Sequence, residues 1–164
     1  MATTYEAIAT VTATTSVANI EFTSIPGTYT DLLVKFSQRA DSATAAVYLQ
    51  FNSSSSNLSN RRLYADGSSA YSFDGTDIVI YGNRSTFTAS TFSNVEIYVP
   101  NYASANYKSV SIDGVTENNA TLAEMSLTAG LWSNTAAITS LKLLAASGNF
   151  VQYSTATLYG IKNS

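Results

Sequence analysis

Residues 20–39, IEFTSIPGTYTDLLVKFSQR, constrain the fold of this chain more than any other stretch. In the second half of this stretch Leu32, Val34 and Phe36 recur at every second position. This period predicts a β-strand with one buried face and one solvent-facing face. A Pro-Gly pair at residues 26–27 supplies a residue without an N–H and a residue that tolerates positive φ, so a turn is expected before the strand. The stretch therefore indicates an antiparallel β protein.

The same alternation recurs along the chain in short runs that end at turn residues. The predicted strands lie within residues 4–14, 17–23, 32–39, 45–52, 71–73, 77–81, 92–99, 107–115, 121–131, 137–146 and 154–162. No amphipathic helix separates them, as parallel βαβ units would require. The pattern predicts an all-β fold, an antiparallel two-sheet β-sandwich of jelly-roll type, with a closed β-barrel as the alternative. Residues 52–67 are interpreted as a polar insertion with a turn of helix at residues 61–64.

A single domain spanning residues 1–164 is expected, because a chain of this length can bury about 70% of its unfolded surface. Residues 1–16 are predicted to form an edge or arm strand, in which alternate residues from Tyr5 to Ala13 share a face of low apolar mass. This segment lacks the lysines and prolines that usually protect a strand edge. We therefore expect residues 1–16 to lie at or near a contact between subunits.

The balance of charge excludes several classes of partner. Charged residues make up 12% of the chain, roughly half the usual share, which leaves a surface of hydroxyl and amide groups. The formal net charge is −3 and only Arg61 and Arg62 are adjacent among the basic residues, so we expect no nucleic-acid partner. No apolar run approaches the roughly 18 residues of a membrane span, and the N-terminus does not resemble a signal peptide, so no membrane partner is expected.

The residue types available argue against catalysis. The chain has no histidine and no cysteine, which excludes the commonest general base, the serine triad and thiol nucleophiles. A pair of carboxylates, as in glycosidases, is the chemistry that remains. Asp-Gly pairs at residues 66–67 and 74–75 could contribute oxygens to Ca²⁺, but hairpin turns explain them more simply. We predict no enzyme activity, no metal and no cofactor.

Aromatic side chains are the more informative group, with eleven Tyr, seven Phe and one Trp. Tyrosine suits contact surfaces because it joins a rigid apolar face to a polar tip. Tyr48, Tyr98 and Tyr159 fall opposite the main apolar set of their strands, and Trp132 follows a predicted strand. We predict that these four residues contribute to a contact surface, which either binds sugar or packs against a neighbouring subunit. The alternative is that aromatic residues simply cover the second face of the sandwich.

Two motifs carry a resemblance to a known group of proteins. The first is I-P-x-T-Y-T-D-L at residues 25–32, which runs into the alternating strand, and the second is S-x-x-x-L-Y-G-I at residues 154–161. Together with the polar insertion at residues 52–67, they resemble small virion proteins of tailed phages, notably those of marine and cyanobacterial hosts. The resemblance implies a structural or adhesive β-sandwich and carries no site residue with it.

This resemblance leads to two expectations about function. The first is a capsid decoration (cement) protein that stabilises the phage head by contacts with the major capsid protein or other virion subunits. A homo-oligomer is expected, a trimer in preference to a dimer because rings of three suit the local symmetry of capsids. The alternative is a tail appendage or receptor-binding module that recognises host-surface glycan. Either role places the protein on the virion, at the capsid surface or tail, after assembly in the host cytoplasm.

Overall fold

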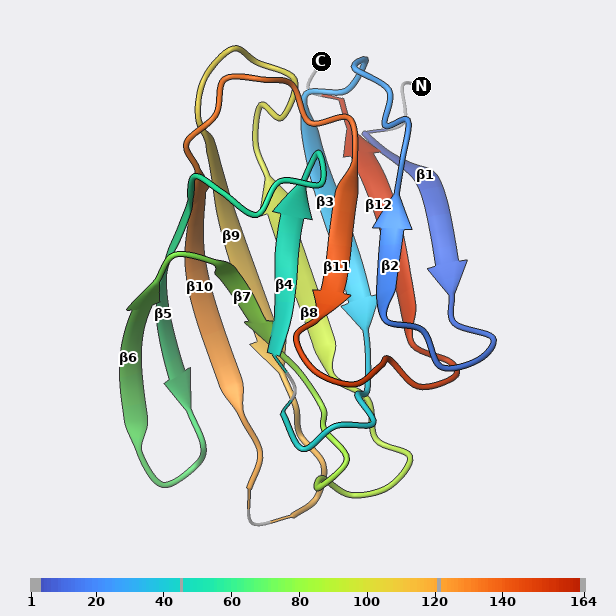
Figure 1. The fold of residues 1–164 in the computed structure, drawn as a ribbon, viewed down its shortest axis with the longest axis vertical. Helices are drawn as coiled ribbons and strands as arrows, with labels where there is room; N and C mark the ends of the chain where they lie inside the picture. The colour runs from blue at the N-terminus through green and yellow to red at the C-terminus, as the bar shows by residue number, and fades with distance from the viewer. Residues whose placement is uncertain (1–3, 45, 121, 163–164) are drawn as a thin grey trace.

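The computed structural model describes residues 4–44, 46–120 and 122–162. Within these ranges it contains twelve strands and no helix, in one eight-stranded and one four-stranded antiparallel sheet that face each other (Figure 1). The strands are β1 (Tyr5–Thr12), β2 (Asn19–Phe22), β3 (Asp31–Ser37), β4 (Ala46–Phe51), β5 (Leu58–Ala65), β6 (Ala70–Gly75), β7 (Ile78–Tyr81), β8 (Asn94–Val99), β9 (Lys108–Val115), β10 (Met125–Trp132), β11 (Leu141–Ala145) and β12 (Thr155–Ile161). The predicted all-β sandwich is confirmed. No helix in the described ranges is long and apolar enough to cross a membrane.

The order of the strands is that of a jelly roll with additions. One half of the jelly roll is β1-β12-β3-β8, and the other half is the whole smaller sheet, β2-β11-β4-β7. Strands from opposite ends of the chain therefore lie side by side in both sheets, as two Greek keys require. The alternative of a closed barrel is wrong, because the described strands of the larger sheet end at β1 on one side and β6 on the other.

Two hairpins extend the larger sheet beyond the jelly roll. The β9–β10 hairpin follows β8, and the β5–β6 hairpin, which comes between β4 and β7 in the chain, pairs with β10. The smaller sheet ends at β7 on this side, so β5 and β6 project past it at the left of Figure 1. We call this projecting part, β5 and β6, the wing. The helical turn predicted at residues 61–64 is wrong, because these residues lie within β5.

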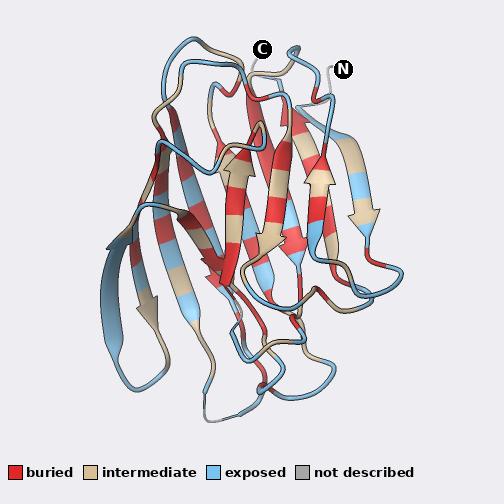
Figure 2. Ribbon diagram, viewed as in Figure 1, coloured by how far each residue is buried: buried red, intermediate tan, exposed pale blue. Residues whose placement is uncertain are grey.

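The core lies between the two sheets and follows the predicted alternation. Leu32, Val34 and Phe36 of β3 are all buried, and Leu49 and Phe51 of β4, in the smaller sheet, belong to the same core. Buried segments recur along the strands of both sheets (Figure 2). Burying each such side chain contributes about 1.5–3 kcal/mol to folding. In β9 buried and exposed residues alternate along the whole strand. These residues form strands because the apolar set at period two can be buried only in an extended chain.

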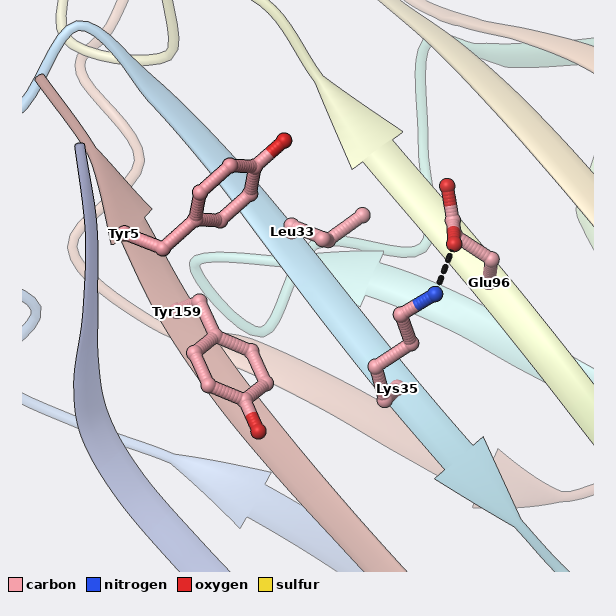
Figure 3. A pocket seen from close by; sticks show the side chains of 5 residues that line it. All are labelled: Tyr5, Leu33, Lys35, Glu96 and Tyr159. Atoms are coloured by element: carbon pink, nitrogen blue, oxygen red, sulfur yellow. Dashed lines mark hydrogen bonds and ion pairs between the residues drawn. The ribbon is translucent and has the colours of Figure 1, made fainter.

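Strand β1 forms one edge of the larger sheet and pairs only with β12 among the described strands. The register shifts between Ala7 and Ala9, so the chain carries a bulge at this point. Ala9 and Val11 pack against the core, whereas Tyr5 lies over the outer face (Figure 3). The two ends of β1 therefore present different faces, because the extra residue inverts the alternation.

Candidate binding surfaces

The structure brings together two of the four predicted contact residues. Tyr98 of β8 and Tyr159 of β12 are both cross-strand partners of Leu33, one on each side of it. The hydroxyl of Tyr98 donates a hydrogen bond to Asp31 Oδ2 at 2.9 Å. This hydrogen bond, with burial and the charge of Asp31, raises the pKa of Tyr98, so the phenol is a neutral donor at physiological pH.

The other two predicted residues lie elsewhere. Tyr48 is half-buried on β4, in the smaller sheet and thus in the other layer of the sandwich. The prediction that Trp132 belongs to a surface is wrong, because its side chain is 1% exposed and its ring packs against Phe51 at 5.7 Å between centroids. Trp132 is the last residue of β10, and its position in the alternation directs it into the core.

The outer face of the larger sheet carries a shallow tyrosine-lined depression of about 330 Å³ (Figure 3). The rings of Tyr5 and Tyr159 lie on one side of it, beside Leu33 of β3. Lys35 and Glu96 point toward one another on the other side and form an ion pair. This depression offers aromatic surface and hydroxyl groups, but the charges on it already neutralise each other.

A second outer surface is apolar, and we call it the apolar patch: Leu63, Val115, Met125 and Leu127. Leu63 faces Leu127 across β5 and β10, and Met125 faces Val115 across β10 and β9. Each of these four side chains is exposed. With neighbouring residues, among them two alanines and Asp113, they line a depression of about 480 Å³. Strand β10 thus turns Met125 and Leu127 to solvent and directs Ser126, Thr128, Gly130 and Trp132 inward.

The inner face of the wing carries a third surface, which we call the arginine groove. It is lined by Arg62, Tyr64, Phe73, Tyr81, Arg84 and Glu124 and encloses about 220 Å³. Tyr64 stacks on Tyr71, with centroids 4.8 Å apart, and on Phe73 at 5.5 Å. These rings lie together because β5 and β6 pair Tyr64 with Tyr71 and Arg62 with Phe73, and the small sheet ends before it could cover them.

Arg62 is the unusual member of the arginine groove. Its side chain is 8% exposed, and the guanidinium carbon lies 4.0 Å from the ring centre of Tyr81 and 5.0 Å from that of Phe73. Its Nε is buried without a hydrogen-bond partner, and no described carboxylate forms an ion pair with it. Arg84, in contrast, is paired with Glu124. The groove therefore holds one cation that is balanced only by aromatic rings.

Tyr64 borders the same groove and is protonated at neutral pH. Burial raises the pKa of its hydroxyl, and the nearby Tyr71, Glu124 and Asp66 raise it further. The hydroxyl can therefore donate a hydrogen bond to a ligand at neutral pH.

The predicted turn carboxylates have structural partners. Asp66 accepts hydrogen bonds from the amides of Ser68 and Ser69, each at 2.9 Å, in the turn between β5 and β6. These bonds lower the pKa of Asp66. The prediction of a hairpin turn at residues 74–75 is wrong, because these residues end β6. Asp74 Oδ2 lies 3.8 Å from Arg61 Nη1. Among the described residues no three acidic side chains gather as a metal site would require.

No family model matches the sequence, and the search of curated proteins found no match. Jelly rolls occur in viral capsid, lectin and cupin domains, so the fold is compatible with structural and sugar-binding roles and fixes neither.

Proposed function

We propose that this protein is a structural subunit of a tailed-phage virion, a capsid decoration protein without enzymatic activity. The two motifs that resemble phage virion proteins support this, because they are neighbours in the fold. Residues 25–32 lead into β3, and residues 154–161 contain β12, which pairs with β3 along its whole length. The resemblance thus concerns a single structural unit of the larger sheet, next to its edge strand β1.

The apolar patch is the observation that carries the proposal. Leu63 is 59% exposed, Leu127 58% and Met125 60%, and they adjoin one another on neighbouring strands. Contiguous exposed apolar side chains on a folded domain mark an interaction surface. Asp113 lies opposite Leu127 and Ser72 opposite Leu63, so the patch has polar neighbours, as in the polar rim of a protein interface. We propose that this face lies on the major capsid protein.

The β1 edge supplies a second contact in this proposal. Its outward edge has no strand partner among the described residues, and its only charged residue, Glu6, is paired with Lys162 at 3.3 Å. An edge with so few protecting charges is suited to a neighbouring copy of the same chain. We propose a homo-oligomer, a trimer in particular, in which β1 lies at the contact between copies.

Attachment to purified particles tests the role. Particles that lack this protein are expected to lose resistance to heat and osmotic shock and to regain it when the purified chain is added. Adding charge to the patch with Met125→Lys and Leu127→Lys should abolish rebinding, since a buried unpaired charge is costly. Ser55→Lys, in the exposed loop between β4 and β5, is the matched control and should rebind normally. Full resistance of particles without the protein would refute the decoration role.

The arginine groove favours a second candidate, a tail appendage that recognises host-surface glycan. Aromatic rings beside a guanidinium form a surface that suits a sugar better than a flat protein face. The two roles differ in location, so a cryo-EM map of the particle separates them. Density on the capsid lattice would support decoration, and density at the tail would support host recognition.

A further inference from the structure

The arginine groove has an uncompensated positive charge. Removing a guanidinium from water is unfavourable unless an anion or hydrogen-bond acceptors replace the water. Three aromatic rings replace part of the lost hydration of the Arg62 guanidinium. Its carbon lies 4.0 Å from the ring centre of Tyr81, 5.0 Å from that of Phe73 and 5.4 Å from that of Tyr64. The Nε without a partner shows that the replacement is incomplete in the chain alone. The Nε itself is buried, so an acceptor from outside the chain would contact the guanidinium on the side where Arg62 lines the groove.

The charges that line the groove select the kind of anion. Arg84 is held by Glu124, so the groove presents the single free charge of Arg62. A carboxylate matches one guanidinium in both charge and fork geometry. A phosphate monoester carries up to two charges at neutral pH, so Glu124 would repel it more strongly than a carboxylate and its second charge would have no cation in the groove. The balance of charge therefore favours a carboxylate.

The shape of the groove restricts the kind of molecule that could bring this carboxylate to Arg62. Phe73 lines the groove and is 44% exposed, so the groove has flat aromatic surface beside Arg62. Its volume of about 220 Å³ is below the roughly 300–1,000 Å³ of sites for drug-sized ligands, which restricts the occupant to one ring-sized unit. Nucleic acid would need several free cations, and the groove has one. A pyranose ring with a carboxyl group combines the required features.

We propose that the arginine groove binds an acidic sugar residue, with its carboxylate on Arg62 and its ring against the aromatic face of Phe73. The proposal specifies the ligand class of the glycan-recognition alternative and rests on that alternative. It is independent of the decoration role. The Tyr64 hydroxyl, protonated at neutral pH, is placed at the same groove to donate to a sugar oxygen.

Titration of the purified full chain tests the proposal by NMR. The probes are methyl glucuronide and its neutral counterpart, methyl glucoside. The glucuronide is expected to bind at millimolar concentration and the glucoside at least about tenfold more weakly, because it lacks the charge-assisted hydrogen bonds. Arg62→Gln should weaken glucuronide binding about tenfold. Arg61→Gln is the matched control, since Arg61 is the adjacent arginine and its side chain is 72% exposed, and it should bind as the wild type does.

A second variant keeps the test decisive if Arg62→Gln unfolds. Phe73→Ala removes a half-exposed ring outside the core, so the chain should fold and bind glucuronide several-fold more weakly. Equal affinity for the two sugars, or unchanged binding by Arg62→Gln and Phe73→Ala, would overturn the proposal. Competition by inorganic phosphate at the same concentration would also overturn it, by showing a general anion site. Particle rebinding by Arg62→Gln is expected to be normal, which separates this inference from the decoration role.

Discussion

The ring of Tyr29 lies directly over Gly160, and a Cβ atom at residue 160 would overlap that ring. Tyr29 belongs to the motif at residues 25–32 and Gly160 to the motif at residues 154–161, so the two motifs meet in a single contact. The loop that carries Tyr29 is also held by Tyr102, whose hydroxyl donates to the carbonyl of Pro26. Glycine is required at residue 160, because only a residue without a side chain leaves room for the Tyr29 ring.

We predict that Gly160→Ala lowers the free energy of unfolding by about 1–3 kcal/mol, because the added methyl group must displace the Tyr29 ring. Gly27→Ala is the matched control. Residue 27 has open space around its Cβ position and no positive φ. The free energy of unfolding of Gly27→Ala should therefore differ from that of the wild type by less than about 1 kcal/mol. Urea unfolding followed by circular dichroism measures both. Equal stability of the two variants would show that Tyr29 can move aside without loss.

Alkaline pH provides a second prediction. Burial raises the pKa of Tyr102 above 10.0, and hydrogen bonding to Asp31 raises that of Tyr98 above the same value. A raised folded-state pKa means that the native state holds its proton more tightly, so this stability is complete below about pH 10 and is lost as the pH rises through the folded-state pKa. Lys108 acts in the opposite direction, because burial lowers its pKa below 10.5.

We therefore expect the urea midpoint to fall as the pH rises above about 10. Tyr102→Phe should make this fall shallower, while costing about 0.5–1.5 kcal/mol at pH 7 for the lost hydrogen bond to Pro26. Tyr153→Phe is the control, since Tyr153 is 68% exposed and should not alter the slope. An identical slope in all three proteins would contradict the assignment of the alkaline loss to Tyr102.

Strands β3 and β10 show what the sequence can and cannot predict. In β3 the apolar set of Leu32, Val34 and Phe36 is the buried set, and period two sufficed to identify it. In β10 the same period separates the two faces correctly, but Met125 and Leu127 face solvent while Trp132 is buried. Gly130 sits on the inner face, where a Cβ would meet Ile78 at 3.0 Å, so close packing favours small residues there. Which face is buried depends on neighbours that one strand does not specify.

The arginine groove could not be predicted from the sequence for a related reason. Arg61 and Arg62 are adjacent and resemble an ordinary solvated pair, and residues 52–67 resemble a polar loop. Once β5 is formed, Arg61 is directed outward and Arg62 inward, where aromatic residues of β6 and β7 surround it. The pairing of Arg62 with Phe73 across the hairpin was the missing information. An alternation of aromatic residues at Tyr71 and Phe73 was the available signal.

Trp132 gives a direct test of its buried position. We predict that Trp132→Ala lowers the free energy of unfolding by about 3–5 kcal/mol, because it leaves a cavity beside Phe51. Tyr48→Ala, a half-buried residue of the other sheet, should cost less. The native tryptophan fluorescence should be blue-shifted and resist quenching by acrylamide. A strongly quenched native signal would contradict burial, and a small cost of Trp132→Ala would place the residue outside the core.

The β1 edge gives a test of oligomerisation. Ala7 is exposed on β1, so Ala7→Lys should change the free energy of unfolding by no more than about 0.5 kcal/mol. A lysine at a strand edge opposes pairing with another chain, so the variant should dissociate at lower dilution than the wild type. Sedimentation equilibrium measures the mass of each. A wild-type monomer at all concentrations would refute the proposed trimer, and an equally stable oligomer of the variant would place the contact away from β1.

The final prediction asks whether Arg62 stabilises the fold. A buried guanidinium without an anion is expensive, and replacement of buried charged groups by apolar residues of similar volume is often neutral or stabilising by about 1–4 kcal/mol. The contacts with Tyr81, Phe73 and Tyr64 offset part of this gain. We therefore expect Arg62→Met to unfold at the same urea concentration as the wild type or a higher one, while losing affinity for methyl glucuronide.

Leu49→Ala, in the core, controls for sensitivity, and its free energy of unfolding should fall by about 2–5 kcal/mol. A comparable loss in Arg62→Met would show that Arg62 has a structural role in the wing, and would remove the argument that its charge is kept for a ligand.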